Sequence, residues 1–325
     1  MQLELRKDYL IDRWVAISPE RGKRPLVFKE DVEVVEKERC PFCPGNEDKT
    51  PPALLIAKRD RDNILWFERD DKEWLVRCFK NLYPAFSTEA EAKFYGTVNV
   101  KPSYGYHEII VETREHEGEL WNMEPEAFFL ALKASLLRAN FFLSDSRIKY
   151  VHLFKNRGRE AGASIRHPHL QIIALDLEPP SITEKASSLG KECKLCKILE
   201  KEKGKERYIM STENIIALCP WASRVPYEIL IAPKKHEKNF FSLKEEELGE
   251  LSFMLCKLFK ALNAIIGPFP FNFWFYSLYK GLEDFHWHLE IFPRLTYLAG
   301  MELGAGVYVN ILAPEDACKN IKDKL

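Results

Sequence analysis

The stretch His167-Pro168-His169-Leu170-Gln171-Ile172-Ile173 recurs in altered form as His286-Trp287-His288-Leu289-Glu290-Ile291-Phe292. The two copies are 119 residues apart (286 minus 167). Polar and apolar residues alternate in both copies, which is the period of a β-strand with one covered face. A recurrence of this kind indicates that the chain is internally duplicated.

The features around the two copies recur in the same order. Each half begins with a Cys-x-x-Cys pair, one starting at Cys40 and the other at Cys193. A strand-like run ending in histidine follows, then an amphipathic helical pattern, then an aromatic and β-branched strand-like run. These expected elements cover residues 107–116, 124–142 and 149–154 in the first half, and residues 227–236, 243–266 and 271–279 in the second. We expect a Ser242/Glu245 capping box to open the second helix and Gly267 to close it.

The repeat predicts an α+β fold built by tandem duplication, each half being an antiparallel sheet with helices on one face. Pro179-Pro180-Ser181 interrupts the pattern between the halves. We therefore predict an N-terminal catalytic domain over residues 1–185 and a C-terminal degenerate domain over residues 186–325.

Composition narrows the class of protein. The 325 residues are 46% hydrophobic and 30% charged, with a net charge of −1, as in ordinary globular proteins. A basic field that would attract nucleic acid is absent, so phosphate recognition must be local. The N-terminal residues lack a signal-peptide pattern, and the apolar runs are short for a bilayer. We expect a cytoplasmic protein with no nucleic-acid or membrane partner.

The two Cys-x-x-Cys pairs predict metal sites. Without an export signal, reduced thiolates are favoured over disulfides. Each pair supplies two soft ligands for tetrahedral zinc, and equivalent positions in the repeat supply two histidines per half. The two predicted structural zinc sites are Cys40, Cys43, His116 and His167, and Cys193, Cys196, His236 and His286. The alternative for either half is a pair of buried cysteines without metal.

Assigning His167 to metal leaves His169 free on the same face of its strand. A neutral imidazole is a nucleophile near pH 7, and a phosphorylated imidazole is a good leaving group. Upstream, residues 156–164 supply glycines for close approach of phosphate, and Ser164 and Gln171 can donate hydrogen bonds to its oxygens. We predict nucleotidyl transfer through a covalent intermediate on His169, with Gln171 and Ser164 as its catalytic partners. The alternative for a lone histidine in a strand is a purely structural role.

The second copy has lost features that phosphate binding needs. Glu290 replaces Gln171, and Glu283 and Asp284 stand where Ala163 and Ser164 are expected. Carboxylates at these positions would repel a phosphate. We therefore expect no catalysis in the second half.

These residues resemble the galactose-1-phosphate uridylyltransferase branch of the histidine-triad superfamily across nearly the whole chain, most specifically in the His-Pro-His-x-Gln segment. The resemblance implies two histidine-triad-like domains in a homodimer whose active site is completed by the neighbouring subunit. It implies a galactose-metabolism enzyme that transfers UMP from UDP-glucose to galactose-1-phosphate by a ping-pong reaction through uridylyl-His169. The substrate contacts that it implies are Arg21, Arg24, Phe79, Asn81, Asn156, Gly162 and Glu302.

Two departures keep other functions open. The second Cys-x-x-Cys site resembles ADP-glucose phosphorylase-like relatives, and Leu82 stands where an aspartate is common in the branch. Adenylyl transfer from ADP-glucose to phosphate by the same histidine is therefore an alternative, although Pro168 favours the uridylyl enzymes. An alternative of another class is a non-catalytic, zinc-stapled nucleotide-binding protein. A zinc-finger nucleic-acid binder is disfavoured, because the predicted ligands are widely spaced and the net charge is negative.

Overall fold

The computed structural model describes residues 4–8, 10–11, 13–17, 39–91, 101–189, 192–278 and 285–325. Of the residues singled out from the sequence, Arg21, Arg24, Glu283 and Asp284 lie outside these ranges. The described strands form an eleven-stranded sheet and a separate three-stranded sheet.

The first half contributes one long helix and a run of neighbouring strands to the large sheet. The strands are β3 (Ala53–Asp60), β4 (Asn63–Phe67), β5 (Trp74–Lys80), β6 (Gly105–Val111), β7 (Tyr150–Arg157) and β8 (His169–Leu175), and the helix is α1 (Pro125–Leu143). Short 3-10 turns, η3 (Glu47–Lys49) and η4 (Arg159–Ala161), lie in its loops. Pro125 stands in the first turn of α1, where a backbone N–H has no helical partner to lose.

The second half repeats this arrangement. Its strands are β9 (Tyr208–Ser211), β10 (Ile215–Leu218), β11 (Ile229–Pro233), β12 (Phe271–Tyr276) and β13 (His288–Pro293), and its long helix is α4 (Glu245–Ile266). Two further helices, α2 (Pro180–Leu189) and α3 (Lys194–Glu202), precede these strands, and the 3-10 turn η5 (Phe240–Ser242) precedes α4. The predicted domain boundary at residue 185 falls within α2.

The two halves join edge to edge into one antiparallel sheet. Its strand order is β4-β3-β5-β6-β8-β7-β12-β13-β11-β10-β9, so that β7 and β12 meet at the centre and β8 and β13 flank them. The pairing at the centre places Asn272 opposite Asn156 and Trp274 opposite Phe154. The duplication is therefore visible as an approximate mirror in the strand order.

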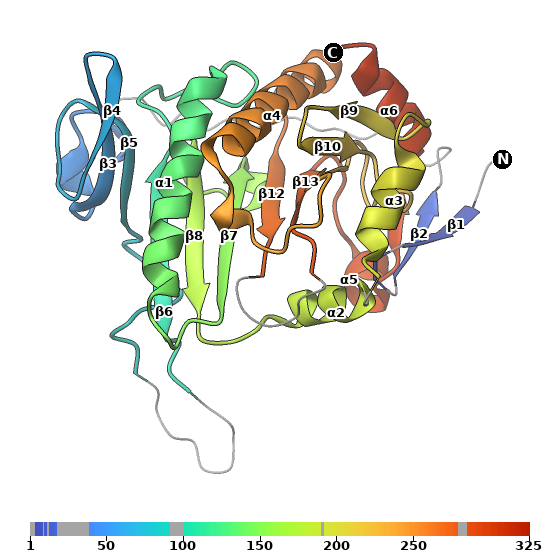
Figure 1. Ribbon diagram of the computed structural model, residues 1–325, viewed down its shortest axis with the longest axis horizontal. Coiled ribbons are helices and arrows are strands. Elements are labelled where there is room, and N and C mark those ends of the chain that lie inside the picture. The colour runs from blue at the N-terminus through green and yellow to red at the C-terminus, as the bar shows by residue number, and fades with distance from the viewer. Residues whose placement is uncertain are drawn as a thin grey trace.

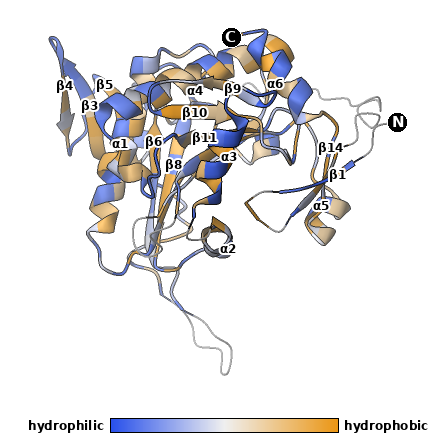
Figure 2. Cartoon of the chain, turned by 45° about the vertical axis from the view of Figure 1, so that its right-hand side comes forward, coloured by the Kyte–Doolittle hydropathy of each residue, from blue (hydrophilic) through white to orange (hydrophobic). Residues whose placement is uncertain are grey.

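Helices α1 and α4 lie side by side over one face of the sheet and enclose the main core (Figure 1). The core takes side chains from both halves, among them Phe142, Leu170, Phe259 and Leu289. Figure 2 shows the hydrophobic colouring running through strands of both halves, such as β8 and β10. These observations confirm the predicted α+β class with antiparallel strands and covering helices.

The opposite face of the sheet is covered differently in the two halves. In the second half, α2 and α3 pack on it through Ile182, Leu195 and Leu199, against Leu218 and Leu230 of the strands. In the first half, a smaller cluster around Phe42 and Phe79 covers the part of this face near β5 and β6. This second covering layer was not predicted, and it decides what surrounds each copy of the repeated motif.

Several predicted boundaries needed correction. The strand-like runs that end in histidine stop earlier, at Val111 and Pro233, so that both histidines lie in the turns that follow. The predicted capping box at Ser242 is wrong, because Ser242 belongs to η5. The side chain of Glu247 instead accepts a hydrogen bond from the backbone N–H of Lys244 at 3.0 Å. Gly267 ends α4 as predicted, with a φ of 72°.

Two strands near the N-terminus and one nearer the C-terminus form the small sheet. Its strands are β1 (Glu4–Lys7), β2 (Trp14–Ile17) and β14 (Tyr308–Asn310). In the sequence, α5 (Gly300–Ala305) precedes β14 and α6 (Pro314–Lys322) follows it. Among the described helices, none combines the length and apolar character that crossing a membrane requires.

Candidate active site and metal clusters

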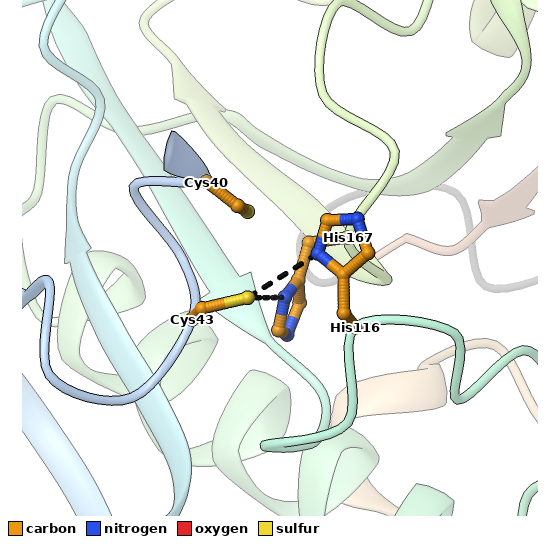
Figure 3. Close-up of side chains that lie close together, drawn as sticks. All are labelled: Cys40, Cys43, His116 and His167. Atoms are coloured by element: carbon orange, nitrogen blue, oxygen red, sulfur yellow. Dashed lines mark hydrogen bonds between the residues drawn. The ribbon is translucent and has the colours of Figure 1, made fainter. Parts of the chain in front are cut away.

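The four predicted ligands of the first half converge at the start of β8. The ligand atoms of Cys40, Cys43, His116 and His167 lie within 4.8 Å of one another, and all four residues are buried. Figure 3 shows the two cysteines approaching from one loop and the histidine rings facing the sulfur of Cys43. The sulfur lies 3.2 Å from Nδ1 of His116 and 3.5 Å from Nδ1 of His167.

The ring of His167 is oriented as a metal ligand would be. Its Nε2 lies 2.8 Å from the carbonyl oxygen of Thr113, which can only accept a hydrogen bond. The proton of the neutral ring therefore sits on Nε2, and the lone pair on Nδ1 faces the sulfur cluster. A carbonyl partner for the far nitrogen is the usual support of a metal-bound histidine.

The second cluster repeats this geometry with greater exposure. Cys193, Cys196, His236 and His286 also bring their ligand atoms within 4.8 Å, but His236 is exposed and both cysteines are only half-buried. Nδ1 of His286 lies 3.2 Å from the sulfur of Cys196, and its Nε2 lies 2.9 Å from the carbonyl of Pro233. Burial lowers the pKa of His286 to about 4, so that its ring is neutral and able to bind metal. Both clusters could therefore hold a metal ion.

His169 opens β8 with its reactive nitrogen defined by the fold. Its Nδ1 lies 2.8 Å from the carbonyl oxygen of His167, so Nδ1 carries the proton and Nε2 carries the lone pair. Burial, opposed by this hydrogen bond, lowers the pKa of His169 to about 4 and keeps the ring neutral. The edge contact with Phe42, at 5.2 Å between ring centres, holds the imidazole plane. Within the part of the chain that the structure describes, Nε2 of His169 makes no hydrogen bond.

The predicted phosphate-binding residues lie on β7, on β8 and in the loop that joins them. Gln171 lies two residues further along β8, on the same face as His169, and is half-buried. Asn156 stands near the end of β7, the strand paired with β8. The loop after β7 turns back at Gly162, which has a left-handed φ of 82°, and continues to the exposed Ser164. The structure thus brings these four predicted residues to one region.

Other predicted substrate contacts are placed differently. Phe79 is only 2% exposed and packs its ring against Phe42, 5.4 Å away, so it lies behind the residue that touches His169. Asn81 follows β5 and lies beside His107. Glu302 lies on α5, which stands apart from β8 in both views (Figures 1 and 2).

Two neighbours of the predicted residues escaped the sequence analysis. His107 contacts the side chain of Gln171, and Asn272 contacts that of Asn156. His107 was visible only as the start of a strand-like run, and Asn272 had no signal because it comes from the other half of the chain.

The second copy of the motif keeps the same backbone hydrogen bond to its second histidine, but side chains of the protein itself contact that histidine. Nδ1 of His288 lies 3.0 Å from the carbonyl of His286, as in the first half, but its Nε2 faces the ammonium group of Lys185 at 3.0 Å. Glu290, at the position of Gln171, is hydrogen-bonded to Lys185 and to Arg224, the latter at 2.6 Å. The obstacle expected from Glu283 and Asp284 lies outside the described residues, whereas this ion-pair network lies within them.

Comparison with known proteins supplies the context of the site. A family described as a domain of unknown function, DUF4921, matches residues 112–325. An ADP-glucose phosphorylase of Arabidopsis thaliana is 33% identical over 98% of this chain and 92% of its own length. A galactose-1-phosphate uridylyltransferase of Thermotoga maritima is 28% identical over 99% of this chain and 98% of its own.

Solved structures agree with these sequence relatives. The crystal structure of the Arabidopsis thaliana ADP-glucose phosphorylase with bound ADP-glucose has a TM-score of 0.82 at 28% identity, covering 99% of both chains. A uridylyltransferase structure has a TM-score of 0.75 at 25% identity, covering 99% of this chain and 98% of the other. The similarity therefore spans both halves of the duplicated chain.

Proposed function

Because this chain belongs to the DUF4921 family and to the histidine-triad branch of galactose-1-phosphate uridylyltransferases and ADP-glucose phosphorylases, we propose that it transfers a nucleoside monophosphate through His169. The observation that carries the proposal is the position of the proton on the His169 ring. Its Nδ1 is engaged by the carbonyl of His167 at 2.8 Å, which leaves the Nε2 lone pair for attack on phosphorus.

The proposed reaction has two displacement steps. Nε2 of His169 attacks the α-phosphorus of a nucleotide sugar, an N–P bond forms, and the P–O bond to the sugar phosphate breaks with its electron pair on the leaving oxygen. The sugar phosphate departs as a weakly basic anion and therefore needs no general acid. A phosphate oxygen of the second substrate then attacks the same phosphorus, and the N–P bond breaks to restore the neutral ring. The His167 carbonyl stabilises the positive charge that Nδ1–H carries while the bond exists.

The side chains around β8 would bind the reacting phosphates. We assign Gln171, Asn156 and Ser164 to hydrogen bonding of the non-bridging oxygens, with Gly162 allowing close approach of the backbone. Further substrate contacts are proposed for Asn81 at the nucleoside, with Phe79 supporting that region from behind Phe42, for Arg21 and Arg24, and for Glu302 at the hexose. Glu302 would serve the neighbouring subunit of a homodimer, since it lies apart from β8 in its own chain.

We propose zinc as the metal of both clusters, because two thiolates and two imidazoles are the donor set of structural zinc. Cys40, Cys43, His116 and His167 would hold one ion, and Cys193, Cys196, His236 and His286 the other. Four protein ligands leave no open position, so the metal would stabilise the fold. Through His167 the first cluster would fix the start of β8, and with it the position of His169.

For the donor, we propose UDP-glucose, with galactose-1-phosphate as acceptor, in galactose metabolism in the cytoplasm. Pro168 within the His-Pro-His-x-Gln segment and the full-length match to a uridylyltransferase support this choice. ADP-glucose with inorganic phosphate is the second candidate. It is favoured by the Cys/His composition of the second cluster and by the 33% identity to an ADP-glucose phosphorylase.

Intact-protein mass spectrometry after incubation with each nucleotide sugar tests the proposal. A mass increase of one UMP with UDP-glucose, absent in His169→Ala, is the expected result. An AMP adduct formed only with ADP-glucose would replace the first donor with the second. If neither sugar modifies the wild-type protein, the proposed covalent transfer through His169 is refuted.

A further inference from the structure

We propose that His107 and Asn272 are positioning residues that fix the side-chain amides of Gln171 and Asn156 with both NH2 groups available to phosphate. This inference rests on the proposed function, in which these two amides bind the transferred phosphate. Phosphate oxygens only accept hydrogen bonds, so an amide that turned its carbonyl oxygen toward them would repel the substrate. The structure contains a separate device against that reversal for each amide.

The first device is the tautomer of His107. The backbone N–H of Ala85 can only donate, and it lies 3.1 Å from Nδ1 of His107. Burial lowers the pKa of His107, so the ring is neutral and its single proton sits on Nε2. Nε2 lies 3.0 Å from Oε1 of Gln171 and donates to it. The amide nitrogen of Asn81 is also 3.0 Å from Nε2, but it is a donor and cannot accept this proton, so it makes no hydrogen bond with the protonated Nε2.

The second device is the polarity of Asn272. The backbone carbonyl of Ala161 can only accept, and it lies 2.8 Å from Nδ2 of Asn272. The same NH2 group donates its other hydrogen to Oδ1 of Asn156 at 2.7 Å. On the far side, the guanidinium of Arg294 approaches Oδ1 of Asn272 at 3.4 Å. The orientation of Asn156 is therefore set by a backbone group through one intermediate amide.

Both devices have the same consequence. With its oxygen occupied, each planar amide carries its NH2 group on the side away from its partner, where no described residue takes it. Two donors thereby reach the substrate with a fixed polarity, which is the form of preorganisation that stabilises developing charge on phosphate. Asn272 also gives the second half of the chain a role in the chemistry of the first.

The tautomer of His107 can be measured without any substrate. Side-chain nitrogen NMR of the full-length protein should show the proton of His107 on Nε2, and the Gln171 amide signals should shift in His107→Phe. A proton on Nδ1 would reverse the chain of donors and overturn the inference, whether or not the protein transfers nucleotides.

Double-mutant cycles test the functional part, with the single-turnover rate of nucleotide attachment to His169 as the readout. His107→Phe keeps the ring volume and should slow attachment on the order of 10- to 100-fold, with the substrate concentration for half-maximal rate nearly unchanged. In a Gln171→Ala background, His107→Phe should slow attachment hardly any further, because the amide that His107 orients is absent. Asn272→Leu should behave in the same way with Asn156→Ala.

The crossed pairs are the matched controls. These controls combine His107→Phe with Asn156→Ala, and Asn272→Leu with Gln171→Ala. In each, the fold-reductions in attachment rate of the two single variants should multiply. Independent effects within the proper pairs would overturn the inference, as would a His107→Phe variant as fast as the wild type. Thermal unfolding of each variant separates misfolding from slow transfer. Absence of any nucleotide adduct in the wild type would refute the proposed function instead, and the NMR measurement would still decide the orientation.

Discussion

The two copies of the repeated motif share a backbone frame and differ in what faces the second histidine. In both, the ring proton on Nδ1 is held by the carbonyl of the preceding histidine, at 2.8 Å for His169 and 3.0 Å for His288. Nε2 of His169 makes no hydrogen bond within the described residues, whereas Nε2 of His288 faces Lys185. The shared backbone frame alone therefore does not decide whether the Nε2 lone pair is free.

The difference originates in the layer that covers the sheet. In the second half α2 crosses the face that carries His288 and brings Lys185 into contact with Glu290, and both of these side chains are about 5% exposed. Glu290 is also paired with Arg224. In the second half an internal cation thus occupies the position that the proposed function assigns to a substrate in the first half. If that function holds, the first half is reactive because no such cation faces Nε2 of His169 within the described residues.

The largest effect is expected at the two histidines themselves. His169→Ala should reduce turnover on the order of 10⁴-fold or more, because it removes the atom that forms the covalent bond. His288→Ala should leave the turnover of folded protein unchanged and lower only its thermal stability. Steady-state assays with the nucleotide sugar that modifies the protein make the comparison.

The histidine pair has a clear opposite result. Equal loss of turnover in both variants, with both proteins folded by circular dichroism, would mean that the second site still takes part in the reaction. The division into one reactive and one filled site would then be wrong.

Gln171 and Glu290 occupy equivalent positions, each two residues after the second histidine of its motif. Exchanging these two side-chain types separates the effect on turnover from the effect on stability. Gln171→Glu should cost about 100- to 1000-fold in turnover, because it replaces an amide donor with a negative charge beside phosphate. Glu290→Gln should leave turnover unchanged but lower the free energy of unfolding by roughly 3 kcal/mol, since Lys185 loses its buried counter-charge. Urea denaturation and initial-rate measurements on both variants provide the test. A turnover loss in Glu290→Gln would break the separation.

The sequence predicted what the repeat itself carries. Alternating residues and equivalent offsets were enough for β6, β7 and β8, for their counterparts β11, β12 and β13, for the two long helices and for the eight residues of the metal clusters, whereas the other described strands were not predicted. Contacts across the duplication had no local signal, because Lys185 and Glu290 are 105 positions apart and Asn156 and Asn272 are 116 apart. Those pairs depend on the register of β7 with β12 and on the path of α2, which are tertiary properties.

The two metal clusters allow the same comparison between the halves, with smaller expected effects on turnover. Cys40→Ser should lower the zinc content by one ion per chain and turnover by about 10- to 100-fold, because His167 would no longer fix the start of β8. Cys193→Ser should lose one ion as well and retain turnover. Elemental analysis by mass spectrometry, run beside the activity assay, measures both quantities.

Exposure gives these clusters an expected order of release. His236 is exposed, whereas all four residues of the first cluster are buried. A chelator should therefore remove the second ion first, without loss of activity. If activity disappears when the more exposed second cluster loses its ion, the buried first cluster is not the one that supports the position of His169.

The smallest effect is expected when Lys185 and Glu290, the ion pair of the second site, are both replaced. Lys185→Met alone leaves Glu290 with one cation in place of two and should cost about 3 kcal/mol of unfolding free energy. Adding Glu290→Leu removes the negative charge left in excess, while Arg224 keeps its 2.8 Å hydrogen bond to Glu228. The double variant should therefore be more stable than Lys185→Met, with turnover unchanged in both, as chemical denaturation and initial rates would measure. Costs that simply add would mean that the two charges do not compensate each other. The second site would then be closed by the packing of α2 rather than by its ion pair.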